Sequence, residues 1–187
     1  GLVKLCFSLM IRSPAFRHRY SHAGIRFGLG FNPETGKSNV QHFWKSAKDI
    51  DLQSCNSGIL LLLYSDGPEF CFGDGLCDTI FTKPIGWRQE NENLIANITG
   101  EAIVPLLPNL CAYLQYRFGG LGTSTNITTV DYSIVNKVNS LTQIYSKEQL
   151  FFSSLKPNLT LDFLRNEHLR FTQVPSPLIP ELKDFFG

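Results

Sequence analysis

The sequence has few charged residues and no hydrophobic run long enough for a transmembrane helix. Asp, Glu, Lys and Arg make up 18% of the 187 residues, whereas about 25% is usual in soluble domains. We therefore expect other chains to cover part of the surface. The longest unbroken apolar run, ILLLLY from Ile59 to Tyr64, is far shorter than the ~20 residues of a transmembrane helix. The sequence thus predicts protein partners and no membrane.

Cysteine occurs at spacings that fit neither a disulfide framework nor a zinc site. The five cysteines are at positions 6, 55, 71, 77 and 111. Their number is odd, and the closest pair, Cys71 and Cys77, has five residues between its members, unlike the CxxC spacing of zinc ligands. We expect no metal site and no cofactor.

The motifs of common enzymes are missing or broken. The stretch GFNPETGKS, from Gly30 to Ser38, has five residues between its glycines, whereas a phosphate-binding loop needs four. Gly28 and Gly30 begin a GxG, but Pro33 stands where the dinucleotide motif requires its third glycine. No GxSxG and no HExxH is present. We therefore predict a protein that is not an enzyme. A nucleotide-dependent enzyme stays as a hypothesis that depends on the imperfect GKS loop alone.

Many short extended segments, separated by Gly, Pro, Asn and Asp, predict an all-β sandwich or barrel. The expected strands are residues 3–11, 23–31, 58–64, 94–104, 110–118, 126–136, 141–145 and 168–174. The segment TNITTVDYSIV alternates most regularly. Short helical turns fit at 39–48, at 146–153 with Ser146 as a cap, and at 158–166. A loop or a strand fits each of these segments equally well.

Two prolines interrupt the stretch GEAIVPLLPNLCAYLQYRFGG. Because proline cannot donate to a sheet ladder, Pro105 and Pro108 predict two strands that meet at a corner. In the second strand a period of two separates two faces. Ala112, Leu114, Tyr116 and Phe118 form the predicted core face, and Cys111, Tyr113, Gln115 and Arg117 form the other.

The short strands, the corner in IVPLLPNLCAYLQYRF, the first residue Gly1 and the prolines at 175, 177 and 180 together resemble the coat proteins of picorna-like viruses. In size the chain is similar to a small coat protein of the plant secovirid group, of the cheravirus type. The resemblance implies one eight-stranded jelly-roll β-sandwich over residues 1–187, with few short helices. It also implies an N-terminal arm at 1–20 and a proline-rich C-terminal arm at 175–187.

Such a protein is a structural subunit of the virion, released from a polyprotein and assembled in the host cytoplasm. Three related jelly rolls form its pseudo-T=3 icosahedral shell, which encloses positive-strand RNA. The resemblance therefore implies two kinds of partner, namely other capsid chains and genomic RNA bound without sequence specificity.

Positive charge is concentrated at the start of the chain. Residues 1–33 contain five cations and no acid, a balance of +5 against +1 for the whole chain, so the remainder carries −4. The cations are Lys4, Arg12, Arg17, Arg19 and Arg26. They are candidates for an RNA-facing inner wall, where cations neutralise phosphates without reading bases. An ordinary solvated edge explains the same charges equally well.

A second class of function also fits the sequence. Glycosylation sequons begin at Asn97, Asn126 and Asn158, and Trp44 and Trp87 are candidates for exposed aromatic residues. A secreted, glycosylated β-sandwich that binds carbohydrate or a receptor is therefore the alternative. Five cysteines without a disulfide pattern count against it.

Overall fold

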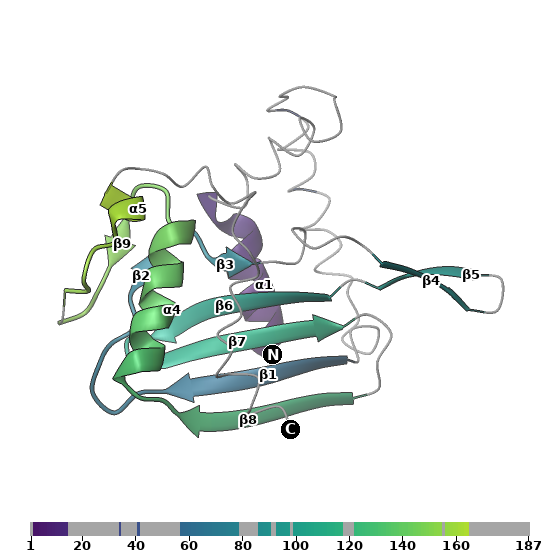
Figure 1. The fold of residues 1–187 in the computed structure, drawn as a ribbon, viewed down its shortest axis with the longest axis horizontal. Helices are drawn as coiled ribbons and strands as arrows, with labels where there is room; N and C mark the ends of the chain where they lie inside the picture. The colour runs from purple at the N-terminus through teal and green to yellow at the C-terminus, as the bar shows by residue number, and fades with distance from the viewer. Residues whose placement is uncertain are drawn as a thin grey trace.

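The computed structural model describes residues 2–14, 34, 41, 57–78, 86–90, 93–97, 99–117, 122–154 and 156–164. Its centre is a five-stranded sheet in the order β3-β6-β7-β1-β8 (Figure 1). In chain order these strands are β1 (Ser57–Tyr64), β3 (Cys77–Asp78), β6 (Thr99–Leu107), β7 (Leu110–Arg117) and β8 (Gly122–Thr129). Strands β1, β6, β7 and β8 are long, whereas β3 has only two residues.

Strand β1 lies between β7 and β8. It is antiparallel to β7, with Leu61 opposite Tyr113, and parallel to β8, with Leu62 opposite Ile127. The sheet is therefore mixed. A run of leucines suits this central position, because a strand covered on both faces has no polar side to its pattern.

Helix α4 (Tyr132–Tyr145) covers one face of the sheet. The core on this face combines Leu61, Leu63, Ile103 and Tyr113 from the strands with Ile134, Val135, Val138 and Tyr145 from the helix. Leu60, Ala102, Val104, Ala112 and Leu114, on the opposite face, are also buried. Helix α1 (Leu2–Arg12) contacts β6, and the side chain of its Cys6 is completely buried. Both faces of the central strands are thus covered.

Smaller elements complete the described part of the chain. Strand β2 (Phe72–Gly73) pairs with β9 (Leu150–Phe151), and β4 (Gly86–Glu90) pairs with β5 (Asn93–Asn97). A four-residue helix, α5 (Leu161–Leu164), follows β9. None of the described helices is long and apolar enough to cross a membrane.

The prediction of a strand-rich chain is confirmed. Predicted strands 58–64 and 110–118 correspond to β1 and β7, and the predicted strand 94–104 is divided between β5 and β6. The expectations for residues 23–31 and 168–174, for the C-terminal arm at 175–187, and for 39–48 except Gln41 lie outside the described residues.

Three local predictions are wrong. Residues 3–11, expected as a strand, belong to helix α1, so the expected arm at 1–20 begins with a helix. The alternation over 126–136 continues only to Thr129, and residues 141–145 lie in α4. The physical reason for this change is Asp131, which accepts a hydrogen bond from Ile134 N at 3.0 Å and starts the helix.

Residues 146–153, where a helical turn, a loop and a strand fitted equally well, contain β9. Ser146 caps the C-terminal end of α4, where its backbone N donates to the Gln143 carbonyl oxygen and its Oγ to that of Thr142. Its role is therefore to end a helix. Of the turn expected at 158–166, the structure contains α5.

The two prolines form a hairpin and not a corner between sheets. Pro105 lies inside β6 opposite Cys111, next to an irregularity in the register, and Pro108 with Asn109 makes the turn to β7. Such an irregularity is where a sheet tolerates proline. Ala112 and Leu114 are buried as predicted, but Cys111 and Tyr113 are buried too, because α4 covers their face.

Candidate functional site

Two of the five predicted RNA-facing cations lie on helix α1. Lys4 and Arg12 are eight residues apart, a little over two helical turns. The Arg12 side chain is exposed. Arg17, Arg19 and Arg26 lie outside the described residues, so of the predicted group the structure places only Lys4 and Arg12.

Among the described residues, a dense set of polar contacts lies where α4 meets the loop after β1 and the segment after α4. We call this region the α4 junction and define it as residues 65–74, α4 and residues 146–160. At its centre, Asn139 Oδ1 accepts a hydrogen bond from Cys71 N at 2.8 Å, and Asn139 Nδ2 donates to the Glu69 carbonyl oxygen at 2.9 Å. One buried amide therefore satisfies a donor and an acceptor of the same loop.

Gln143 repeats this arrangement one helical turn later. Its Nε2 donates to the Asn158 carbonyl oxygen at 2.7 Å, and its Oε1 accepts from Thr160 N at 2.7 Å. Residues four apart lie on the same face of a helix. Asn139 thus holds the loop at 69–71 against α4, and Gln143 holds residues 158–160.

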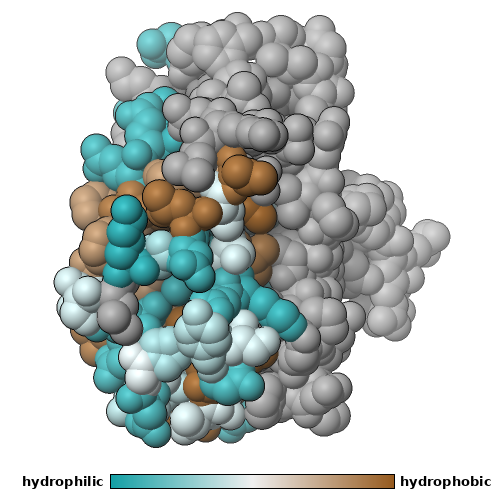
Figure 2. All heavy atoms as spheres, turned by 60° about the vertical axis from the view of Figure 1, so that its left-hand side comes forward, coloured by the Kyte–Doolittle hydropathy of each residue, from teal (hydrophilic) through white to brown (hydrophobic). Residues whose placement is uncertain are grey.

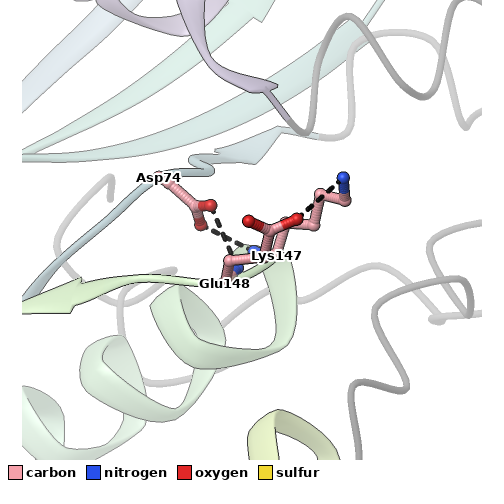
Figure 3. Close-up of polar contacts among 3 residues, drawn as sticks. All are labelled: Asp74, Lys147 and Glu148. Atoms are coloured by element: carbon pink, nitrogen blue, oxygen red, sulfur yellow. Dashed lines mark hydrogen bonds and ion pairs between the residues drawn. The ribbon is translucent and has the colours of Figure 1, made fainter.

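Two carboxylates of the loop after β1, Asp74 and Glu69, accept hydrogen bonds from the segment after α4. Asp74 accepts hydrogen bonds from Lys147 N at 2.6 Å and Glu148 N at 3.0 Å, as Figure 3 shows. Glu69 accepts from both the backbone N and the Oγ of Ser154. At Gly73 a side chain would collide with Ser146 Oγ, so the close approach of β2 to the end of α4 requires glycine.

The chemistry of the junction is structural. The side chains of Asn139, Gln143 and Asp74 bind backbone groups. Burial raises the pKa of the Cys71 thiol from its ordinary value of 9.0 to about 11, and burial does the same to the pKa of Cys6. Burial thus favours the protonated form of both thiols.

Large hydrophobic side chains are exposed at several places among the described residues. Four belong to the segment after α4: Phe151, Phe152, Leu159 and Leu161. Figure 2 turns the side with β9 and α5 forward and shows hydrophobic surface gathered in one band between hydrophilic regions. Others are Leu5 and Leu9 on α1, Leu107 at the hairpin, Ile127 on β8 and Tyr132 at the start of α4.

Strand β8 forms one border of the five-stranded sheet. Thr125, Asn126, Ile127 and Thr129 are exposed, and the Ile127 side chain keeps 70% of its surface accessible. Two sequon asparagines, Asn126 on β8 and Asn158 after β9, are therefore on the surface. For the third, Asn97, the structure gives its place in β5 but no side-chain exposure.

Within the described ranges, no group of three or more His, Cys, Asp or Glu side chains is placed to hold a metal ion. Comparison of the chain with protein-family models, with curated protein sequences and with solved structures finds no match. Sequence reasoning missed the Asn139 and Gln143 pair. The available signal was two amide side chains four residues apart, on the same side as Val135 and Val138. We instead expected strands at 126–136 and 141–145, with Asn139 between them.

Proposed function

We propose that this protein is a structural subunit that works by assembling with other protein chains, in the specific form of a coat protein of a picorna-like virus. The observation that carries the proposal is the exposure of large hydrophobic side chains on β8, α1 and the segment after α4. Exposed apolar surface of this kind marks sites of association. A low charge content makes such surfaces easier to bury, because fewer charges must lose their water.

The jelly-roll arrangement is part of this proposal as an expectation from the sequence. A jelly roll consists of two antiparallel sheets, whereas the described sheet contains the parallel pair β1 and β8 and carries α4 on one face. Assembly through exposed side chains does not require the jelly-roll topology. The assembly proposal therefore stands independently of it.

Within the coat-protein proposal, Lys4, Arg12, Arg17, Arg19 and Arg26 face the RNA. Neutralising Arg12, Arg17 and Arg19 together is expected to lower the amount of packaged RNA, or to weaken RNA retention as salt rises, because each lost phosphate contact reduces the salt-dependent term. Empty particles should still form. Normal packaging by the triple variant across a salt series would show that these arginines face elsewhere.

Electron microscopy and sedimentation of the purified chain test the assembly proposal. Uniform closed particles, or defined oligomers that grow with protein concentration, are the expected result. A monomer that persists at high concentration contradicts it, because exposed apolar surfaces of a shell subunit are covered only by neighbours.

The alternative, a secreted glycosylated binding module, is favoured by one specific observation, the exposure of Asn126 and Asn158. Mass spectrometry of the native protein separates the two functions. Glycans on these asparagines would support the secreted module, whereas a coat protein assembled in the cytoplasm should carry none.

A further inference from the structure

Among the described residues, the β8 edge shows no charge, proline or bulge of the kind that usually prevents a strand from pairing with another molecule. Proteins protect sheet edges with charges, prolines, bulges or very short strands. The strand at the opposite edge, β3, has two described residues. Strand β8 has eight residues, GTSTNITT, with no charge and no proline, and its register with β1 is unbroken from Gly122 to Thr129.

The backbone of β8 directs half of its polar groups away from β1. Val130 N donates to the Tyr64 carbonyl oxygen at 2.8 Å, so the backbone groups of Val130 point toward β1. Because these groups alternate along a strand, Thr125, Ile127 and Thr129 direct their N–H and C=O groups outward. All three residues are exposed.

We propose that this edge pairs with the β8 edge of a second copy of the chain, antiparallel and about a two-fold axis at Ile127. In this register Ile127 lies opposite Ile127, and Thr125 lies opposite Thr129 on both sides of the axis. Each of these positions has outward backbone groups. The hydrogen-bonded positions of an antiparallel ladder are therefore the positions that β8 leaves available.

The side chains also favour a second copy over an unrelated strand. Threonine opposite threonine and isoleucine opposite isoleucine are favourable cross-strand pairs. With no charge between Gly122 and Val130, no like charges meet across the two-fold axis. In this antiparallel register, β8 is thus complementary to a second copy of itself.

Within the described part of the chain, no further strand pairs with β8 beyond β1. Helix α4 contacts β2 and β3, at the other side of the sheet, and β8 is the outermost strand of the sheet in Figure 1. A two-fold axis perpendicular to the sheet places both copies of α4 on the same face. The dimer then contains one continuous sheet of ten strands, five from each copy.

This inference rests on the proposed assembly function and names its first contact. Cysteine cross-linking of the full chain tests it, because residues of a hydrogen-bonded antiparallel pair have Cα atoms about 5.5 Å apart, within the range of a disulfide. Ile127→Cys is expected to give a covalent dimer on mild oxidation. The wild type, with its own cysteines, and Asn126→Cys, which lies opposite Thr128 and not opposite itself, should give little.

Sedimentation equilibrium supplies a second readout. Ile127→Lys places two positive charges opposite each other, so we expect the Kd for dimerisation to rise by at least about 100-fold. Tyr132→Lys, a change at a similarly exposed residue outside the edge, should leave the Kd within about threefold of the wild type. Circular dichroism checks that both variants keep the fold.

Wild-type chain that stays monomeric, or equal cross-linking of the Ile127→Cys and Asn126→Cys variants, overturns the edge pairing. A dimer that forms no larger particle keeps the pairing and rejects the coat function. If particles form while Ile127→Cys fails to cross-link, the coat function is kept and the edge pairing is rejected.

Discussion

The α4 junction and the β8 edge show two opposite ways of treating backbone polar groups. In the junction, Asn139, Gln143 and Asp74 satisfy the backbone of loops that have no ladder of their own. On β8, Thr125, Ile127 and Thr129 direct a regular row of backbone groups outward. The backbone groups of the junction loops thus find their partners within one chain. The outward groups of β8 have the regular spacing needed to pair with a second chain.

The largest expected difference is between the unfolding free energies lost on shortening a core side chain and a side chain on the β8 edge. Leu114 on β7 is 3% exposed, so Leu114→Ala should lower the free energy of unfolding by about 2–5 kcal/mol. Ile127→Ala on the edge should change it by less than about 0.5 kcal/mol in dilute protein. Urea unfolding of both variants measures the contrast. Similar losses for the two would show that β8 is covered within the single chain.

Removing the central amide of the junction should have the next largest effect. Asn139→Ala leaves Cys71 N–H and the Glu69 carbonyl without the partner they have now. Two unsatisfied groups in this region should cost about 2–4 kcal/mol of unfolding free energy. The matched control is Asn136→Ala at a half-buried position of the same helix. Its unfolding free energy should stay within about 0.5 kcal/mol of the wild type. Equal effects would mean that the amide bridges contribute little.

The buried thiol of Cys71 makes the junction sensitive to alkaline pH. Its pKa is raised by burial from 9.0 to about 11, so the folded state favours the protonated thiol. This contribution is complete below pH 9 and is lost as the pH rises toward 11. Cys71→Ala should therefore lose unfolding free energy less steeply than the wild type between pH 9 and pH 11. Parallel pH profiles would contradict the assignment.

The smallest effect is expected where β8 passes into α4. Asp131→Ala removes the side chain that accepts from Ile134 N, which should cost about 1 kcal/mol. Asp131→Asn retains a side-chain acceptor and should stay within about 0.5 kcal/mol of the wild type. Thermal unfolding monitored by circular dichroism compares the two. If the asparagine variant is as unstable as the alanine variant, charge and not the cap geometry starts the helix.

The sequence was sufficient to predict β1 and β7, because their hydrophobic patterns are long and bounded by turn residues. It failed at β8 and α4 because Thr128, Val130, Tyr132 and Ile134 alternate across the boundary between them. Asp131 was present in the pattern, but a single capping residue is a weaker signal than alternation. Local pattern therefore located β1 and β7 but took the helical residues 3–11 and 141–145 for strands.

The junction was beyond prediction for a different reason. Cys71 and Asn139 are 68 residues apart in the chain, and only the folded sheet brings β2 beside α4. Sequence pattern reports which residues share a face, not which distant loop meets that face. For the predicted cation group, the structure places Lys4 and Arg12 on helix α1, where a strand was expected at 3–11.

Hydrogen exchange at increasing protein concentration tests the contrast between the two regions most directly. Backbone amides of Cys111–Leu114 and of α4 should exchange slowly at every concentration, because their protection comes from one chain. The amides of Thr125, Ile127 and Thr129 should exchange fast in dilute protein and slow down as concentration rises, while those of Asn126 and Thr128 change little. Fast exchange of the three outward amides across the whole concentration range would contradict the account.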